Sequence, residues 1–286
     1  MSTPLRLVVL GNPIAHSKSP AIHRDFASQL GLPVQYERVL APLDGFVGTV
    51  RALQAAGVAG ANVTVPFKQA AFELASQFSE GARFAEAANT LVFSSEGIRA
   101  DNTDGGGLCR DLNRQLQAQQ LSLADCEVVL LGAGGAASGC MAAFKNHGVQ
   151  ALTILNRTVH KAEALAQRAS SIGLPSAGAG FDAKAPSTSL PRVVVNASSA
   201  SLAGEAPAVD PAWYNNAVLA YDMMYGAEPT AFVRKVASMN PALPTSDGLG
   251  MLVFQAALAF EIWTGRAPDG LATLARMRQG LGQQHG

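Results

Sequence analysis

Residues 128–139, VVLLGAGGAASG, decide the fold class of this chain. An apolar run typical of a buried strand leads directly into the pattern G-x-G-x-x-A at Gly132, Gly134 and Ala137. Gly132 permits a tight turn, Gly134 lets a backbone approach a pyrophosphate, and Ala137 is small enough for a helix to lie close on the strand. The first N–H groups of that helix would face the phosphates. The stretch therefore predicts a dinucleotide-binding βα unit, the alternative being a tight turn without a ligand.

The next predicted strand separates the two nicotinamide cofactors. An NAD site places Asp or Glu about 20 residues beyond the glycine turn, against the ribose 2′-hydroxyl. Here the strand ends in Asn156, Arg157 and Thr158, with Lys161 one helical turn later. A carboxylate would repel a 2′-phosphate, whereas a guanidinium binds it through two parallel hydrogen bonds and stacks on adenine. We therefore predict NADP(H), the alternative being a solvated arginine at a strand end.

Strand-like and helix-like runs alternate on both sides of the glycine turn. The segments before it are predicted strands at 5–11, 34–40 and 60–65, helices at 19–31 and 43–57, and a hairpin at 90–101. The segments after it are predicted strands at 126–132, 151–156, 192–198 and 217–224, with room for one short strand in 171–190. The glycines at 105–107 are the clearest break between the two series, and residues 248–286 read as two helices.

Composition excludes several classes of protein. A length of 286 residues suits about two domains. Zero formal net charge and the lack of a basic stripe argue against nucleic acid and anionic membranes as partners. The longest apolar stretch, residues 250–263, is too short for a membrane helix. Cys109, Cys126 and Cys140 fit neither a disulfide framework nor a zinc motif, so we predict reduced thiols in a cytoplasmic protein without a metal.

The segment NVTVPFK, residues 62–68, ends a predicted strand with a lysine. The carboxyl ends of strands are where open α/β sheets bind ligands, and Lys68 could handle a hydroxyl proton as hydride leaves the carbon. Asp104, in the predicted loop ADNTDGGG, is the best candidate to position it. Thr64 and Asn89 add neutral hydrogen-bonding groups. Taken singly, Lys68 could be a surface lysine and Asp104 a helix N-cap.

A second polar cluster, GNPIAHSKSPAIH at residues 11–23, follows the first predicted strand. Ser19 and Pro20 are typical of an N-cap followed by proline at the first helical position. Ser17 is not needed for that cap. Two hydroxyls at a helix N-terminus would suit an anionic carboxylate. The two histidines of the segment are predicted to be structural.

Together these motifs resemble the bacterial shikimate dehydrogenase family. The matching stretches, in order over nearly the whole chain, are GNPIAHSKSPAIH, GANVTVPFK, AANTL, DNTDGGGL, GAGGAA, NRT, YDMMY and DGLGMLVFQAA. The resemblance implies NADPH-dependent, reversible reduction of 3-dehydroshikimate to shikimate, in chorismate and aromatic amino acid biosynthesis. It implies a small-molecule substrate, no nucleic acid or membrane partner, and a monomer or homodimer.

The resemblance also implies a role for individual residues. The catalytic pair would be Lys68 and Asp104. The substrate-binding residues would be Ser17, Ser19, Thr64, Asn89, Asp104, Tyr225 and Gln255, with Asn62 and Thr64 on one edge of a polyol pocket. The cofactor-binding residues would be Gly132, Ala133, Gly134, Gly135, Ala136, Asn156, Arg157, Thr158, Lys161, Met223 and Gly248, with Glu80 added on alignment alone. The family's NATSxG reads NASSAS at residues 196–201, and no role is assigned there.

The predicted fold is α/β with two domains. A substrate-binding and catalytic domain of residues 1–106, with a mostly parallel sheet, would be completed by C-terminal helices returning from 248–286, as the resemblance implies. Residues 107–247 would form a Rossmann-type NADP-binding domain. The rival functions are a quinate/shikimate dehydrogenase using NAD(P), a non-catalytic NADP-sensing module and a methylene-folate dehydrogenase. Arg157 argues against the first, and the combination of Lys68, Asp104 and the serine pair argues against the sensing module. The serine cluster suits a small carboxylate better than a pterin, which argues against the methylene-folate dehydrogenase.

Overall fold

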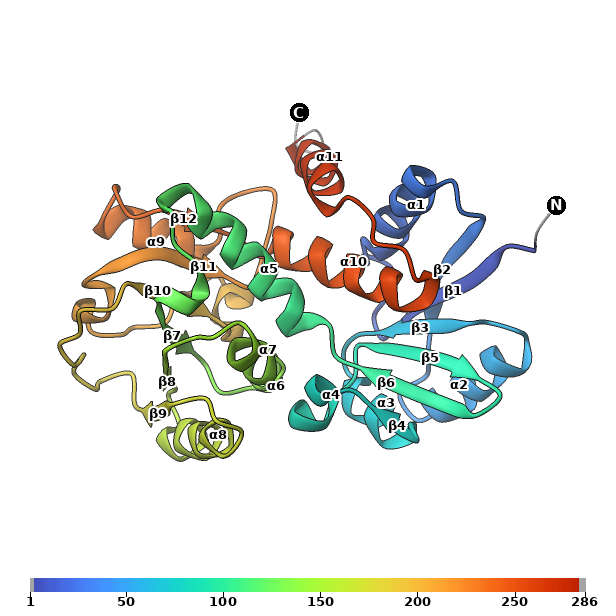
Figure 1. Ribbon diagram of the computed structural model, residues 1–286, viewed down its shortest axis with the longest axis horizontal. Helices are drawn as coiled ribbons and strands as arrows, with labels where there is room; N and C mark the ends of the chain where they lie inside the picture. Colours follow the sequence, from blue (N-terminus) through green and yellow to red (C-terminus); the bar gives the residue numbers. More distant parts are fainter. Residues whose placement is uncertain (1–2, 283–286) are drawn as a thin grey trace. The chain divides into compact units, whose positions relative to one another are not determined.

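The computed structural model describes residues 3–282, which divide into two compact units (Figure 1). Among the described residues, the first unit takes 3–107 and 253–277, and the second takes 108–252 and 278–282. Each unit contains one six-stranded sheet.

The sheet of the first unit has the strand order β2-β1-β3-β5-β6-β4. Its strands are β1 Leu5–Gly11, β2 Val34–Leu40, β3 Gly60–Val63, β4 Gln77–Phe78, β5 Thr90–Ser94 and β6 Gly97–Asp101. β1 is parallel to β2 and β3, and β4 is parallel to β6. β5 is antiparallel to both β3 and β6, which confirms the predicted hairpin and makes the sheet mixed rather than uniformly parallel.

The helices that contribute to the first unit come from both ends of the chain. They are α1 Ser19–Leu30, α2 Phe46–Ala55, α3 Lys68–Leu74, α4 Glu80–Ala85, the start of α5 Asp104–Leu116, most of α10 Leu249–Thr264 and most of α11 Gly270–Gly282. The expectation that Asp104 lies in a loop is wrong, because it is the first residue of α5. Lys68 follows β3 as predicted and is the first residue of α3. The glycines at 105–107 lie inside α5, and the division between the two units falls directly after them, between residues 107 and 108.

The return of the C-terminal helices to the first unit is confirmed. On α10, the indole Nε1 of Trp263 donates a hydrogen bond to the backbone oxygen of Leu91 in β5, at 2.9 Å. On α11, Thr273 accepts a hydrogen bond of 2.8 Å from Gln29 of α1, and the two helices lie side by side in Figure 1. The partners in these two hydrogen bonds lie 172 and 244 positions apart in the sequence. Hydrophobic periodicity, which is a local signal, therefore could not predict which unit these two helices join.

The second unit is a doubly wound sheet in which every strand pair is parallel, with the order β12-β11-β10-β7-β8-β9. Its strands are β7 Glu127–Leu131, β8 Ala151–Leu155, β9 Ser176–Ala179, β10 Arg192–Asn196, β11 Ala217–Asp222 and β12 Thr245–Ser246. Its other helices are α6 Gly135–Ser138, α7 Met141–Asn146, α8 Val159–Ser171 and α9 Ala231–Met239, with short 3-10 turns at 117–119, 123–125, 199–203 and 211–214. The strand order reverses between β7 and β10, the position where such sheets bind ligands.

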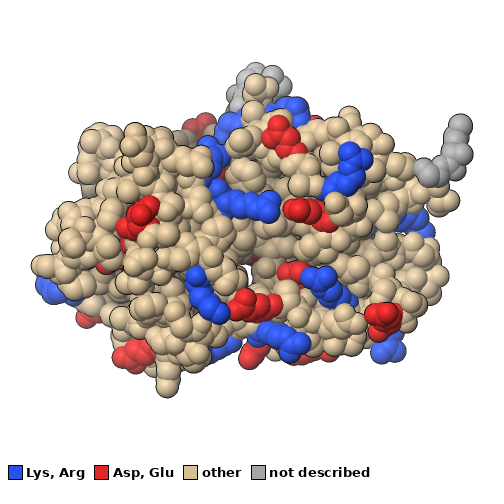
Figure 2. Space-filling view, in the orientation of Figure 1, with Lys and Arg blue, Asp and Glu red and all other residues tan. Residues whose placement is uncertain are grey.

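The surface carries both signs of charge. On the face in Figure 2, Lys and Arg alternate with Asp and Glu over a largely uncharged surface. Within residues 3–282, no helix combines the length and apolar character that crossing a membrane requires. The same residues contain no group of three or more His, Cys, Asp or Glu side chains placed to hold a metal ion.

Candidate active site

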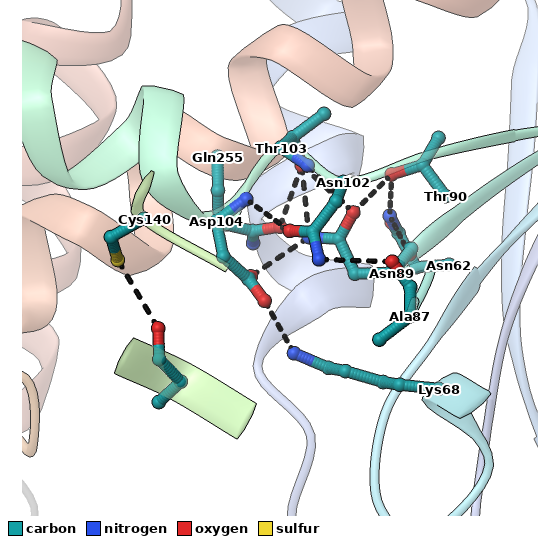
Figure 3. Close-up of polar contacts among 11 residues, drawn as sticks. Asn62, Lys68, Ala87, Asn89, Thr90, Asn102, Thr103, Asp104, Cys140 and Gln255 are labelled. Carbon is teal, nitrogen blue, oxygen red and sulfur yellow. Dashed lines mark hydrogen bonds and ion pairs between the residues drawn. The ribbon is translucent and has the colours of Figure 1, made fainter. Parts of the chain in front are cut away.

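Lys68 and Asp104 meet in the first unit although 36 positions separate them in the sequence. Lys68 Nζ donates a hydrogen bond to Asp104 Oδ2 at 2.5 Å (Figure 3). The lysine side chain is 33% exposed and the aspartate side chain 14%, so the ammonium remains accessible while its partner is largely enclosed. An ammonium that is held in place and still reachable can donate a proton to a bound molecule, and the neutral amine that remains can accept one.

Local structure at two helix starts delivers this pair. The buried ring of Phe67 anchors the turn after β3, and α3 begins at the following residue, Lys68. At the start of α5, the backbone N–H of Asp104 donates to Asn102 Oδ1 at 3.2 Å. Asn102 in turn donates to the backbone oxygen of Ala87 at 3.1 Å. Both charged groups therefore lie on backbone that side-chain and packing contacts hold in place.

The other carboxylate oxygen of Asp104 is held by Asn89. Asn89 Nδ2 lies 2.8 Å from Asp104 Oδ1, 2.9 Å from Thr103 Oγ1 and 3.2 Å from Gln255 Oε1. The structure thus brings together Asn89, Asp104 and Gln255, three of the residues predicted to bind substrate. Asn89 is only 3% exposed, so most of its hydrogen-bonding capacity is directed to the protein.

Two further predicted substrate-binding segments lie at the same edge of this sheet. β1 and β3 are parallel, with Leu10 paired to Val63, so the segments that follow them leave the sheet together. Thr64 follows β3 directly and is half-buried. Since ligands bind outside the carboxyl ends of α/β strands, this edge is the place for a substrate.

The serine pair lies beyond β1, at the start of α1. The N-cap position is Lys18 rather than Ser19, which is the buried first residue of the helix, so the expected capping role of Ser19 is wrong. Ser17 Oγ instead accepts a hydrogen bond of 3.3 Å from the backbone N–H of Ser19. The proline that follows is at an early helical position, as expected.

Asn62 does not have the free amide that an edge of a polyol pocket requires. It is buried in β3, and its Oδ1 lies 2.6 Å from the hydroxyl of Tyr36 and 3.2 Å from Nε2 of His23. Its Nδ2 lies 3.1 Å from both the backbone oxygen of Asn89 and the hydroxyl of Thr90. The expectation for Asn62 is therefore wrong, because protein groups use both ends of its carboxamide.

In the second unit, the glycine turn has the features expected of a pyrophosphate site. Gly132 has φ +115°, and a β-carbon there would lie 3.0 Å from the backbone nitrogen of Ser198, so glycine is required. A β-carbon on Gly134 or Gly135 would meet no atom within 4 Å, so this backbone is open to a ligand. Ala137 is fully buried, as a close approach of helix to strand requires.

The segment after β8 has the features expected of a 2′-phosphate site. Asn156 Nδ2 donates a hydrogen bond of 2.9 Å to the backbone oxygen of Thr158, which closes the turn into α8. Arg157 and Lys161 are exposed, and the first turn of α8 contains no acidic residue. Two cations beside a helix start without a carboxylate suit a phosphate and disfavour a ribose diol.

Three further predicted site residues, Gly248, Tyr225 and Glu80, belong to neither the glycine turn nor the segment after β8. The backbone N–H of Gly248 donates to the oxygen of Met224 at 2.9 Å, and a β-carbon there would lie 2.0 Å from the oxygen of Met223. Tyr225 is half-buried in the second unit, and burial raises the pKa of its hydroxyl, with a smaller contribution from Asp247. Glu80 is the exposed first residue of α4 in the first unit, and its link to the cofactor stays a prediction.

Comparison with known proteins identifies the family. Three family models match: the shikimate dehydrogenase substrate binding domain over residues 9–91, shikimate/quinate 5-dehydrogenase over 114–176, and the shikimate 5′-dehydrogenase C-terminal domain over 248–279. The shikimate dehydrogenase (NADP(+)) of Cupriavidus necator is 46% identical over 98% of this chain and 95% of its own length. The chain belongs to the shikimate dehydrogenase family.

Solved structures of the shikimate dehydrogenase fold agree with this chain over nearly its full length. The Thermus thermophilus shikimate 5-dehydrogenase, in complex with NADP(H) and shikimate, has a TM-score of 0.77 and 31% identity, covering 97% of this chain and 100% of that one. A 5-ketofructose reductase of a Gluconobacter strain has a TM-score of 0.84 and 25% identity, covering 97% and 99%. The fold therefore occurs in reductases with different names, and substrate choice has to be argued from side chains.

One departure from the shikimate dehydrogenase pattern forms a polar network that sequence reasoning missed. Ser201, where the family pattern has glycine, donates to Asp222 Oδ2 at 2.7 Å and accepts from Asn196 Nδ2 at 3.2 Å. Asn196 also donates to Asp222 Oδ1 at 3.0 Å, and Thr230 donates to Oδ2 at 2.6 Å. The buried carboxylate of Asp222 thus ties the ends of β10 and β11 beside the switch point. The polar residues that end two apolar strands, at 196 and 222, were the available signal.

Proposed function

We propose that this chain is an NADP-dependent shikimate dehydrogenase, which reversibly reduces 3-dehydroshikimate to shikimate in chorismate and aromatic amino acid biosynthesis. The observation that carries the proposal is the 2.5 Å contact between Lys68 Nζ and Asp104 Oδ2, in a chain whose relatives carry that name. A family member without this pair could bind the same ligands, but it would lack a positioned acid and base.

Lys68 is the proton donor and acceptor in this proposal. Reduction of a ketone places negative charge on its oxygen, and the Lys68 ammonium gives that oxygen a proton as an N–H bond breaks and an O–H bond forms. In the oxidation of shikimate the neutral amine takes the hydroxyl proton back. Asp104 fixes the direction of the lysine through Oδ2 while Asn89 holds Oδ1. NADPH, when bound, supplies the hydride.

Around this pair, the proposed substrate contacts come from the edge formed by the ends of β1 and β3. The hydroxyls of Ser17 and Ser19 would hold the carboxylate of shikimate, and Thr64, Asn89, Asp104 and Gln255 would bind its ring hydroxyls. Tyr225 stays a predicted substrate contact on the resemblance alone. A small acid with several hydroxyl groups suits this set, because neutral donors and acceptors outnumber charges.

For the cofactor, the open backbone at Gly134 and Gly135 supports pyrophosphate binding, and Arg157 with Lys161 supports a preference for NADP over NAD. Residues Met223 and Gly248 would lie by the nicotinamide. Each of these residues belongs to the second unit, which we propose to be the NADP-binding domain. The first unit would then be the substrate-binding and catalytic domain.

The deciding experiment is a coenzyme-linked oxidation assay with the purified full chain. Shikimate and quinate are each tested with NADP and with NAD, and 5-ketofructose is tested as an oxidant of NADPH. We expect shikimate with NADP to give the highest kcat/KM. Higher kcat/KM with quinate, with NAD or with 5-ketofructose would replace the proposal by one of the rival activities. NADPH binding without turnover of any substrate would indicate a sensing module.

The proposal includes a cellular setting. Cys109, Cys126 and Cys140 are buried and form no disulfide among the described residues, which supports a reducing compartment such as the cytoplasm. We propose a small molecule as the partner of the site, and a monomer or homodimer as the assembly.

A further inference from the structure

A line of hydrogen bonds connects the interior of the first unit to Asp104 (Figure 3). Asn62 Nδ2 lies 3.1 Å from the hydroxyl of Thr90, which lies 2.9 Å from Asn89 Oδ1. Asn89 Nδ2 then lies 2.8 Å from Asp104 Oδ1. Asn62 and Thr90 are buried, at 6% and 0% exposure. The sequence assigned Thr90 no role, and it predicted contact with substrate for Asn62, which its burial does not favour.

The direction of the first carboxamide is fixed by a group that can only accept. The nitrogen of the Asn62 side chain lies 3.1 Å from the backbone oxygen of Asn89. A carbonyl oxygen has no hydrogen to donate, so this end of the amide must be the NH₂ group. The opposite end is therefore the carbonyl, and it accepts from the hydroxyl of Tyr36 at 2.6 Å.

His23 donates to the same carbonyl. Its Nε2 lies 3.2 Å from Asn62 Oδ1, an acceptor, so Nε2 carries the hydrogen. The ring is stacked on Tyr36 at 4.1 Å between centroids, and its buried Nδ1 has no hydrogen-bond partner. Complete burial lowers the pKa of His23 to about 3, against a smaller raising effect of its hydrogen bond to Asn62. The far end of the line therefore stays a neutral donor.

The direction of the second carboxamide is fixed by a group that can only donate. The backbone N–H of Thr103 lies 2.9 Å from Asn89 Oδ1, which must therefore be the carbonyl oxygen. The hydroxyl of Thr90, which accepts from Asn62, is left with its hydrogen for this same oxygen. The NH₂ group of Asn89 then has to face Asp104. Each link in the line donates toward the carboxylate.

We propose that Asn62 and Thr90 are positioning residues for the catalytic pair. Together with the backbone N–H of Thr103, they hold the Asn89 carboxamide so that its N–H group contacts Asp104 Oδ1 and leaves Oδ2 for Lys68. A reversed Asn89 amide would place a carbonyl oxygen against a carboxylate, and repulsion would displace the acid and base from their alignment. The inference rests on the proposed function, since it assigns these residues a role in that reaction.

The test compares two Thr90 variants, each of which removes one of the two groups on the β-carbon. Thr90→Val keeps the shape and removes the hydroxyl, whereas Thr90→Ser keeps the hydroxyl and removes the methyl group. We expect Thr90→Val to lower kcat for shikimate at least about tenfold, because small misplacements of catalytic groups have large effects. Thr90→Ser should keep kcat close to wild type although it loses packing. Affinity for NADP, measured by fluorescence, should change in neither variant.

A second readout does not depend on turnover. The side-chain NH₂ resonances of Asn89, assigned through Asn89→Asp in nitrogen-15 spectra of the ligand-free protein, should shift or broaden in Thr90→Val and stay in place in Thr90→Ser. A matched control is Thr273→Val, which removes another buried threonine hydroxyl of the first unit, bonded to Asp25. This control should lower Tm and leave both kcat and the Asn89 resonances unchanged.

The outcomes separate this inference from the proposed function. If wild-type protein does not oxidise shikimate, the proposed function fails, while the Asn89 resonances still report on the line of hydrogen bonds. If wild type is active and Thr90→Val keeps kcat with unchanged Asn89 resonances, the inference is overturned. Greater loss of kcat in Thr90→Ser than in Thr90→Val would also overturn it, since packing would then be the role of Thr90. Should Thr90→Val not fold, Tyr36→Phe removes a donor at the far end of the line, and the same two readouts decide.

Discussion

At the scale of single residues, Lys68 and Asp104 differ from a second lysine–aspartate pair of similar length, Lys184 and Asp210. Lys184 Nζ lies 2.7 Å from Asp210 Oδ2, but its side chain is 89% exposed, against 33% for Lys68. An exposed ion pair contributes little to stability, because water screens the attraction and two flexible side chains lose conformational entropy when they are ordered. The enclosed pair has a second anchor, since Asn89 fixes the carboxylate independently of the lysine.

This difference predicts the effect of removing each lysine. Lys68→Ala should lower kcat for shikimate at least about 100-fold, the usual contribution of a positioned acid or base, with a small change in KM. Lys184→Ala, the matched control in the second unit, should leave both constants unchanged. Steady-state kinetics of the two variants check the prediction. Near-wild-type kcat in Lys68→Ala would remove the lysine from the mechanism.

Arg157 gives a second prediction at this scale. A hydrogen bond from a guanidinium to a charged group contributes about 1.5–3 kcal/mol, so Arg157→Ala should raise KM for NADP by about 10- to 100-fold. KM for NAD should hardly change, because NAD has no 2′-phosphate. Arg168→Ala is the control, because Arg168 lies in the last turn of α8 and Arg157 just before its start, and it should alter neither constant. Equal losses with both coenzymes would show that Arg157 does not read the phosphate.

At the scale of elements, the contact of α5 with α10 decides what the three glycines at 105–107 do. A β-carbon on Gly107 would lie 2.5 Å from the backbone nitrogen of Gln255, so the two helices touch through backbone. Glycine is a poor helix former, so three consecutive glycines disfavour a continuous helix at this position, which is also where the two units divide. Tertiary contact outweighs that preference here, and a sequence read locally could not show it.

The same contact yields a prediction with an internal control. Gly107→Ala should lower the free energy of unfolding by about 1–3 kcal/mol, the usual cost of overpacking, and should reduce activity because Gln255 would move. Gly48→Ala, in α2, meets no atom within 4 Å and should instead raise the free energy of unfolding by up to about 1 kcal/mol. Urea unfolding of both variants provides the measurement. A stabilising effect of Gly107→Ala would mean that the helices do not approach closely.

Sequence reasoning worked where chemistry is local and failed where it depends on a distant partner. The strand–turn–helix at Gly132 and the alternation of elements were readable, because periodicity and turn chemistry are written in neighbouring residues. Asp104 was found from its motif, but the adjacent Asn102 and Thr103 were missed. Their roles exist only because Ala87 and Asn89 lie against them, and no spacing in the sequence reports that.

At the scale of the whole molecule, the two sheets show how topology limits prediction. The second sheet is parallel throughout, as its strand and helix alternation indicated. The first is mixed because the chain enters β5 after two short helices and returns through a hairpin. The two-residue strand β4 then joins the edge beside β6. A two-residue strand is too short to show an alternation of apolar and polar residues, so the pairing of β4 with β6 could not be predicted from the sequence.

Stability of the whole chain should depend on pH through one buried residue. His23 lies among Phe26, Tyr36, Phe260 and Trp263, side chains that carry no charge at neutral pH. Burial lowers its pKa from 6.5 to about 3 in the folded protein. Between these values the unfolded chain binds a proton that the folded protein does not bind, so the stabilising contribution is complete above pH 6.5. It is lost progressively as the pH falls toward 3.

The expected slope is about 1.4 kcal/mol of unfolding free energy per pH unit, the value for one proton. His147 has a pKa lowered by burial as well and adds a slope of the same sign, so wild type alone cannot isolate His23. His23→Gln keeps an N–H donor for Asn62 and does not titrate. The difference in unfolding free energy between wild type and His23→Gln, followed in urea from pH 7 to pH 4.5, should therefore change in favour of the variant as the pH falls. A constant difference over this range would mean that His23 takes up its proton in the folded state, and that the donor at the buried end of the hydrogen-bond line is an imidazolium.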